Sequence, residues 1–322
     1  MRIISLFSGA GAFDLGLIQE GHEIIFANDI DKDAVDTYSK NIGNHIILED
    51  ISKIPSELIL DGDVVMGGFP CQGFSRANLR RSISDERNKL YLELLRVIRE
   101  KQPRYFLAEN VRGLLSLDGG KVIEIIEEDF SSAGYRVDKK LFNMADFGVP
   151  QNRWRVIIAG TRNDLSLEAN FPFPKPTHRK ISNSSQLEIE RSSLKPWVTV
   201  SEALAGIPEP EDGKNQIPNH VYSKYKVTNR NFTGHRRTDP NKPSPTILAR
   251  GDGKGGVCAI QHPNNHRRMT VRESAVIQTF PIDFEFFGSM NSCYRQVGNA
   301  VPVLFAKALG KQLKVPEKKL EA

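Results

Sequence analysis

The sequence predicts an α/β protein, with a mostly parallel β-sheet covered by helices on both faces and a small, irregular, basic second domain. Up to about residue 160, short runs of β-branched and aromatic residues alternate with stretches whose apolar residues have helical spacing. This alternation is typical of strand–helix–strand units. After the Pro-rich segment 171–176 the chain becomes polar, with Pro, Asn, Ser and Arg scattered among short strand-like pieces.

Seven strands are expected, in chain order, at Arg2–Phe7, Glu23–Ala27, His45–Leu48, Asp63–Met66, Arg104–Ala108, Tyr135–Phe142 and Arg155–Ala159. Four helices are expected between them, at Phe13–Glu20, Lys32–Asn41, Glu86–Lys101 and Lys121–Ala133. In the small domain, short strands are expected at Thr246–Leu248 and Val257–Ile260. Two further helices, Val271–Gln278 and Val303–Leu313, are expected to return the chain to the main domain.

Five residues fall at or just past the ends of predicted strands, namely Phe7, Asp29, Asp50, Cys71 and Glu109. In open α/β sheets, ligands bind outside the carboxyl ends of the strands. We therefore expect these five side chains to face one ligand site.

The length of the chain and the distribution of its charge indicate the number of domains and the kind of ligand. A chain of 322 residues can bury one large core and a smaller one. Of the net charge of +5, residues 175–272 contribute a surplus of nine, from 17 Lys and Arg against 8 Asp and Glu, so the remainder carries −4. A basic segment on a mildly acidic body is typical of a polyanion-binding domain, and a Lys-rich solvated surface is the alternative.

The lengths of the apolar runs and the spacing of the cysteines indicate where the protein is located and whether it binds a metal. No apolar run approaches the ~20 residues needed to cross a bilayer, and the chain enters a predicted strand at Arg2 without a signal peptide. Cys71, Cys258 and Cys293 have no framework spacing and no Cys/His cluster. We therefore expect a cytoplasmic protein without membrane spans, disulfides, structural zinc or another metal site.

The turn Phe7-Ser8-Gly9-Ala10-Gly11 follows the first predicted strand, and its glycines let the backbone approach a ligand closely. It lacks the third glycine of the dinucleotide fingerprint, so a plain tight turn is the alternative. About 20 residues further on, Asp29 can bind ribose hydroxyls, and Asp50 can accept from an adenine amino group. Together they favour an adenosyl ligand such as S-adenosylmethionine over a pyrophosphate-bearing dinucleotide.

Pro70-Cys71-Gln72 follows an apolar run and places a thiol at a strand-to-helix turn, where helix-terminal N–H groups favour the thiolate. A cysteine at the edge of an apolar run is more often part of the core. Here Glu109 at a strand end and the paired Arg153 and Arg155 favour a nucleophile instead.

Six motifs in this order resemble the motif set of DNA (cytosine-5)-methyltransferases of the bacterial restriction-modification type. They are Phe7–Gly11, Gly68–Ser75, Glu109–Val111, Gln151–Arg155, Arg268–Glu273 and Gly298–Pro302. The resemblance covers nearly the whole chain except about residues 175–267. It implies the Rossmann-like fold of S-adenosylmethionine-dependent methyltransferases, with the small domain as a target-recognition domain.

The resemblance implies methyl transfer from S-adenosylmethionine to carbon 5 of a cytosine flipped out of a specific duplex DNA sequence, with S-adenosylhomocysteine as product. A Cys71 thiolate adding at carbon 6 would turn carbon 5 into a nucleophile. Glu109 would provide the proton for ring nitrogen 3. Arg155 would contact the oxygen at carbon 2, and Arg153 would support the cysteine region and the DNA backbone. The alternatives are a cap role for Glu109 and an exposed arginine pair on an edge strand.

Cofactor and DNA contacts are carried over in the same way. Phe7 would stack on the adenine, Ile30 would cover it where the family often has an aromatic residue, and Asn299 would lie near the methionine end. The expected cofactor residues are Phe7, Gly9, Gly11, Asp29, Ile30, Asp50, Ile51, Pro70, Leu90 and Asn299. The Arg-rich segment 73–88 would close over DNA around the extruded base, with an ordinary solvated loop as the alternative. The expected DNA contacts are Ser75, Arg76, Arg80, Arg81, Arg236, Arg237, Arg250 and Lys254.

Residues 1–172 and 297–322 are expected to form the catalytic and cofactor-binding domain, 173–272 the target-recognition domain and 273–296 a bracing hinge. The expected partners are double-stranded DNA and a cognate restriction endonuclease acting on the same site, and the expected state is a nucleoid-associated monomer. Three alternatives stay open. One is a tRNA cytosine-5 methyltransferase, whose Cys-Phe-Thr tripeptide is absent here. The others are a non-catalytic DNA-binding regulator on the same scaffold and a NAD-linked oxidoreductase.

Overall fold

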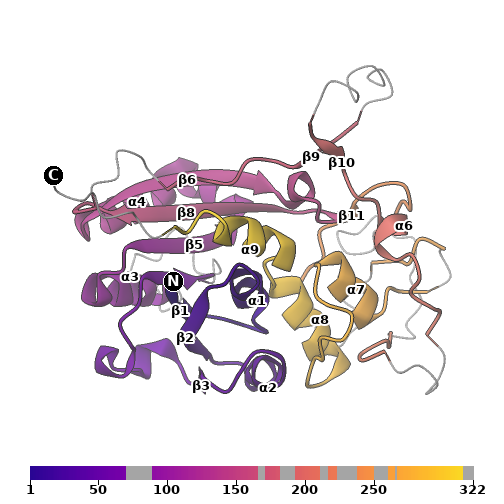
Figure 1. The fold of residues 1–322 in the computed structure, drawn as a ribbon, viewed down its shortest axis with the longest axis horizontal. Coiled ribbons are helices and arrows are strands. Elements are labelled where there is room, and N and C mark those ends of the chain that lie inside the picture. Colours follow the sequence, from indigo (N-terminus) through magenta and orange to yellow (C-terminus); the bar gives the residue numbers. More distant parts are fainter. Residues whose placement is uncertain are drawn as a thin grey trace.

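The protein is described by a computed structural model covering residues 1–69, 89–165, 171–181, 193–210, 217–222, 238–249, 260–264 and 267–314. Its centre is a seven-stranded sheet with the strand order β3-β2-β1-β4-β5-β8-β6 (Figure 1). These strands are β1 (Arg2–Leu6), β2 (Glu23–Asp29), β3 (Ile46–Leu48), β4 (Val64–Gly67), β5 (Tyr105–Val111), β6 (Tyr135–Asn143) and β8 (Trp154–Arg162). The pairs from β3 to β5 are parallel, and β8 is antiparallel to both β5 and β6. The predicted mostly parallel sheet is confirmed.

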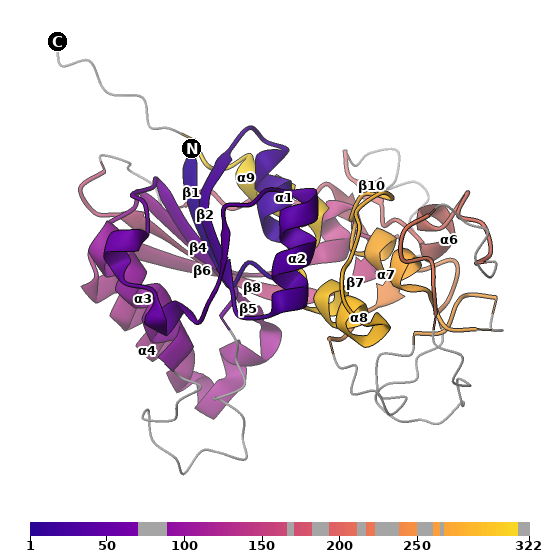
Figure 2. The ribbon, with the colours of Figure 1, turned by 90° about the horizontal axis from the view of Figure 1, so that it is seen from below.

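Helices cover both faces of the sheet (Figure 2). On one face lie α1 (Ala12–Ile18), α2 (Lys32–Asn41) and α9 (Val303–Gly310). On the other lie α3 (Lys89–Lys101) and α4 (Lys121–Ser132). Each face has its own apolar cluster, with Leu17 and Phe305 in the first and Leu94 and Phe130 in the second. Complete burial of such side chains stabilises the fold by about 1.5–3 kcal/mol each.

A third apolar cluster joins α6 (Val200–Ala203), α7 (Val271–Ile277) and α8 (Met290–Asn299) to the end of the main domain. Val200, Ile247 and Ile260 come from the segment predicted to bind DNA, and Val303 comes from α9. The small domain is therefore anchored to the main domain by a packed core.

Short elements complete the described chain. The 3₁₀ helices are η1 (Ile51–Lys53), η2 (Ser56–Leu58), η6 (Arg112–Gly120) and η7 (Met144–Phe147). Two two-stranded parallel sheets pair β7 (Gln151–Asn152) with β11 (Ser244–Pro245) and β9 (His178–Arg179) with β10 (Lys195–Pro196). Within the described ranges, every helix is too short or too polar to span a lipid bilayer.

The seven predicted strands and six predicted helices are present, with ends that differ by a few residues. Helix α8 was not predicted. The strand expected at Thr246–Leu248 is wrong, because the short strand β11 lies at Ser244–Pro245 instead. Of the strand expected at Val257–Ile260, only Ile260 is among the described residues, and the neighbouring bridge joins Gln261 to Arg268. The predicted domain boundaries stay a prediction.

Candidate active site

The turn between β1 and α1 has a backbone that few side chains permit. Phe7, Gly9 and Gly11 have φ values of +56°, +55° and +83°. A Cβ on Gly11 would lie 2.7 Å from the Tyr38 ring, so that position has no room for a side chain. The Gly9 N–H donates to Asp29 Oδ2 at 2.7 Å. A left-handed Phe7 costs roughly 1–3 kcal/mol, and such strain is typical of functional sites.

The ends of β2 and β3 carry the acidic residues predicted to bind an adenosyl ligand. Asp29 ends β2, and burial raises the pKa of its carboxyl, while N–H groups of Asp31 and Gly9 donate to it and oppose that rise. Asp50 caps η1, and its Oδ1 accepts from the backbone N–H and the hydroxyl of Ser52. The two carboxyls therefore follow neighbouring strands at the same edge of the sheet.

The other expected cofactor residues differ in exposure. Ile30 is 69% exposed, which is unfavourable for an apolar side chain unless a ligand covers it. Ile51 is buried, and Leu90 packs against the cluster beneath α3. Asn299 lies exposed at the end of α8, and Pro70 lies outside the described residues. A buried carboxyl beside an exposed apolar residue and a strained glycine turn fits an adenosyl group.

Glu109 and Arg155 form an ion pair at the end of the sheet. Glu109 is 9% exposed on β5, and Arg155 Nε lies 2.6 Å from its Oε1. The antiparallel pairing of β5 with β8 brings them together by placing Val111 opposite Arg155. Within the described part of the chain, Glu109 Oε1 accepts no hydrogen bond of good geometry.

Arg153 has a different environment from the one expected. Its side chain is fully buried and donates to three carbonyls, Ile247 O at 2.9 Å, Gly298 O at 2.8 Å and Ala300 O at 3.1 Å. Burial lowers the pKa of the guanidinium, with a further contribution from the neighbouring Arg155 charge. Arg153 has no exposed surface in this structure, and its expected contact with the DNA backbone stays a prediction. It joins three segments of the chain at the site.

Gln151 belongs to the same junction. It is buried, donates to Gln278 Oε1 at 2.8 Å and accepts from the Ile247 N–H at 2.9 Å. Gln278 in turn donates to Val297 O at 2.7 Å. Gln151 and Arg153 therefore attach the start of β8 to α8 and to the segment that follows β11.

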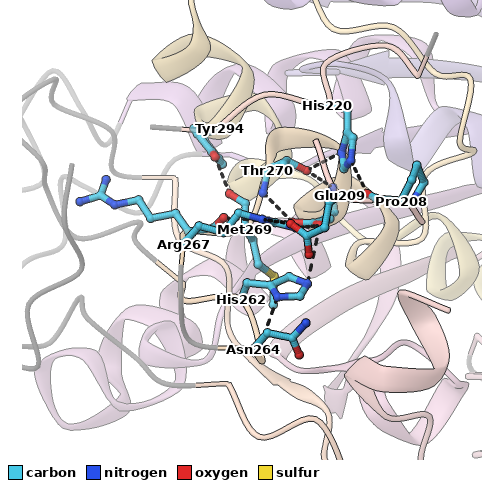
Figure 3. A network of polar contacts seen from close by, with 11 residues as sticks. Pro208, Glu209, His220, His262, Asn264, Arg267, Met269, Thr270 and Tyr294 are labelled. Atoms are coloured by element: carbon cyan, nitrogen blue, oxygen red, sulfur yellow. Dashed lines mark hydrogen bonds and ion pairs between the residues drawn. The ribbon is translucent and has the colours of Figure 1, made fainter. Parts of the chain in front are cut away.

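A second polar network attaches the small domain to α7 (Figure 3). Thr270 and Glu273 form a capping box at the start of this helix, and Arg267 donates to both carboxylate oxygens of Glu273 at 2.8 Å. Glu209 accepts from Arg267 Nε at 2.8 Å. The His220 ring contacts Thr270 Oγ1 and the carbonyl of Pro208. These contacts give Thr270 and Glu273 a structural role.

Arg272, the next residue of the same motif, is also structural. Its side chain is fully buried and donates to the carbonyls of Pro218 and Pro281 at 2.9 Å each, and to that of Phe284. Burial lowers the pKa of this guanidinium to about 10. The helix therefore braces the loops on both sides of it.

Several expected residues lie outside the described part of the chain. They are Cys71 and all the expected DNA contacts, Ser75, Arg76, Arg80, Arg81, Arg236, Arg237, Arg250 and Lys254. The strand leading to Cys71 is described. A Cβ on Gly68 would lie 3.1 Å from Glu109 Oε2, and Asn110 Nδ2 donates to Phe69 O at 3.0 Å. The segment that precedes the cysteine in the sequence therefore contacts Glu109 and its neighbour.

This arrangement was compared with known proteins. Residues 1–315 match the family model of the C-5 cytosine-specific DNA methylases. The chain belongs to this family. The methylase is 39% identical to the Type II methyltransferase M.NgoFVII of Neisseria gonorrhoeae, over 94% of this chain and 83% of that one. It is 37% identical to the Type II methyltransferase M.FnuDI of Fusobacterium nucleatum, over 98% and 94%.

Solved structures agree with the fold of the methylase. A prophage-encoded Escherichia coli protein, described as a candidate DNA modification methyltransferase, superposes with a TM-score of 0.76 at 25% identity, over 97% of this chain and 98% of that one. The Dnmt2 methyltransferase of S. pombe superposes with a TM-score of 0.70 at 21% identity, over 96% and 97%. The family excludes the NAD-linked oxidoreductase.

One buried group of the methylase was missed by sequence reasoning. Asp14, in the first turn of α1, is fully buried and accepts from Ser5 Oγ and the Tyr38 hydroxyl, both at 2.8 Å. Burial raises the pKa of its carboxyl to about 6. An acidic residue inside the otherwise apolar stretch Ala12–Ile18 is the signal that could have revealed it. Asp14 lies directly beneath the strained turn and ties it to α2 through Tyr38.

Proposed function

We propose that this DNA methylase transfers a methyl group from S-adenosylmethionine to carbon 5 of a cytosine flipped out of a specific duplex DNA sequence, through a covalent bond from Cys71 to carbon 6. The observation that carries the proposal is the Glu109–Arg155 ion pair, which lies next to the segment preceding Cys71. Base extrusion is required because the thiolate must approach the ring face that stacking covers.

The chemistry divides among three side chains. The Cys71 thiolate forms the bond to carbon 6, and the displaced electron pair makes carbon 5 nucleophilic while nitrogen 3 takes a proton carried by Glu109. Arg155, held beside Glu109, presents a permanent positive charge to the oxygen at carbon 2. After carbon 5 has been methylated, it loses its proton to solvent, and cleavage of the sulfur–carbon bond releases the thiolate. Return of the nitrogen 3 proton to Glu109 then leaves the neutral, aromatic 5-methylcytosine.

The methyl donor would lie along the ends of β1, β2 and β3. When bound, S-adenosylmethionine supplies an electrophilic methyl group. Asp29 would bind the ribose hydroxyls and Asp50 the adenine amino group, while Ile30 would cover the base. The glycine turn at Gly9 and Gly11 would let the backbone approach the ligand without a side chain between them.

The remaining expectations are part of the same proposal. Residues 173–272 would recognise the target sequence, with Arg236, Arg237, Arg250 and Lys254 as DNA contacts, and the segment 73–88 would close over the extruded base. The enzyme would act in the cytoplasm as a monomer, beside a restriction endonuclease that cuts the same sequence.

Expression of the protein in a host without cytosine methylation tests the proposal. Bisulfite sequencing of the host DNA is expected to show 5-methylcytosine in one sequence context, and Cys71→Ser is expected to abolish it. With purified enzyme and S-adenosylmethionine, a duplex containing 5-fluorocytosine in that context is expected to become linked to the protein. Methylation of tRNA but not of DNA, or methylation of DNA that survives Cys71→Ser, would contradict the proposal.

A further inference from the structure

An exposed aromatic–cation pair lies beside the Glu109–Arg155 ion pair. Trp154 is the first residue of β8 and is 39% exposed, and the guanidinium carbon of Arg112 lies 5.5 Å from the centroid of its ring. Arg112 is the first residue of η6, directly after β5. The two strands that hold the ion pair therefore also hold this second pair.

Apart from their contact with each other, neither side chain has an ion-pair or hydrogen-bond partner among the described residues. Arg112 is exposed and has no ion-pair or hydrogen-bond partner among the described residues, whereas Arg96, Arg104 and Arg162 each pair with a carboxylate. The other tryptophan, Trp197, is half-buried and donates its indole N–H to Asp146 Oδ1 at 2.8 Å. A large aromatic ring left in water with an unpaired cation on it is available for an outside ligand.

The position of Arg112 and Trp154 on the sheet indicates which kind of ligand they can bind. Successive residues of a strand point to opposite faces, so Trp154 and Arg155 project from adjacent positions to opposite sides of β8. Val111, which pairs with Arg155 across the strands, is itself 42% exposed. Arg112 directly follows β5 and Trp154 begins the antiparallel β8, so the Arg112–Trp154 pair lies at the same sheet end as Glu109, where the proposed function places the extruded base.

We propose that Arg112 and Trp154 form a DNA contact of this methylase, in which Arg112 binds a backbone phosphate and Trp154 packs on a nucleotide that flanks the extruded cytosine. This inference rests on the proposed function. A cation with free N–H donors suits phosphate, and an exposed indole suits the face of an unstacked base or a sugar. A nucleic acid presents both chemistries together.

Fluorescence provides a direct test, because the chain has two tryptophans. In Trp197→Phe, Trp154 is the single tryptophan and reports on its own surroundings. Addition of an unmethylated duplex carrying the methylated sequence context is expected to quench its emission. The signal should saturate together with binding measured by anisotropy of the labelled duplex. Binding without any change in Trp154 emission would overturn the proposal.

Kinetics separates a DNA contact from a structural role. Trp154→Ala is expected to raise the KM for DNA by about 5- to 150-fold, the effect of losing one stacking contact. The KM for S-adenosylmethionine should stay unchanged, and Trp154→Phe should restore most of the affinity. Arg112→Ala should lower the slope of log affinity against log salt by about one.

The matched control is Arg99→Ala, which removes an exposed arginine of α3 that donates to Ser132 Oγ. It is expected to leave the KM for DNA and the salt slope unchanged. If the wild-type enzyme methylates DNA but Trp154→Ala and Arg112→Ala bind DNA like wild type, the proposed contact is wrong and the proposed function stands. If the wild-type enzyme itself does not methylate DNA, the proposed function fails.

Discussion

Replacement of Arg153 tests whether its three carbonyl contacts hold the start of β8 to the segments around Ile247 and Gly298. Arg153→Ala removes the donors to Ile247 O, Gly298 O and Ala300 O, all in a fully buried place. A buried acceptor left without its partner costs about 1–3 kcal/mol. Because carbonyl oxygens can keep other weak partners, we take the lower part of that range for each of the three carbonyls. Together they give an expected loss in the free energy of unfolding of about 3–5 kcal/mol.

Urea unfolding at pH 7, followed by circular dichroism, measures this loss. For 322 residues, an unfolding entropy of about 2.1 cal/mol/K per residue converts 3–5 kcal/mol into a decrease in Tm of about 4–8 °C. Arg153→Lys keeps the charge, but the single nitrogen of lysine replaces two donor nitrogens of arginine. This variant is therefore expected to lose about half as much free energy of unfolding as Arg153→Ala. A loss below about 1 kcal/mol for Arg153→Ala would show that the carbonyls are satisfied without Arg153, and would refute the reasoning.

Three further changes test the site and the fold. Burial raises the pKa of Asp14 from 3.8 to about 6, so between these pH values the folded state keeps a proton that the unfolded state loses. The free energy of unfolding in urea should therefore fall by about 2 kcal/mol as the pH rises from 4 to 6. This slope should be absent in Asp14→Asn. Glu109→Gln should lower kcat about 10²- to 10⁴-fold in a methyl-transfer assay, and an unchanged kcat would contradict its role. Gly16→Ala places a Cβ 2.5 Å from that of Ala306, and thermal unfolding should show a loss of about 1–3 kcal/mol. Gly113→Ala, with nothing within 4 Å, is its control and should show none.

The sheet and the edge that carries Asp29 and Asp50 could be predicted because each depends on local sequence. Runs of β-branched and aromatic residues give strands such as β1 and β4, and their carboxyl ends follow from the chain direction. The Glu109–Arg155 pair needed one more step, the antiparallel return of β8 beside β5, which the strand pattern does not specify. Only the family resemblance brought the two residues together in advance.

The environment of Arg153 could not be predicted. Its alternation with Gln151 and Arg155 indicates one face of a strand, but the pattern does not tell what covers that face. The covering carbonyls come from Ile247 and Gly298, 94 and 145 residues away along the chain. An arginine on a strand near a DNA site is expected to be exposed, so the long-range packing that buries it overrides the local expectation.

Helix α8 was missed for a related reason. Its residues Met290–Asn299 include Gly298 and several polar side chains with weak helix propensity. Ser289 caps its start by accepting from the Ser292 N–H, and the helix buries Tyr294 and Val297 in the third apolar cluster. Tertiary packing, and not intrinsic propensity, therefore stabilises this helix.

The packing of α1 against α9 has a consequence for synthesis of the protein. Leu17 of the first helix contacts the region of Phe305 and Leu309 in the last one, and Gly16 lies against Ala306 without room for a side chain. A ribosome that adds about 5–20 residues per second needs roughly 16–64 s to make 322 residues. Throughout that time the apolar side of the first helix stays uncovered in the nascent chain. The helix α9 can thus cover α1 only after almost the whole chain has been made, and a message truncated before residue 303 yields a chain whose first helix keeps an exposed apolar surface.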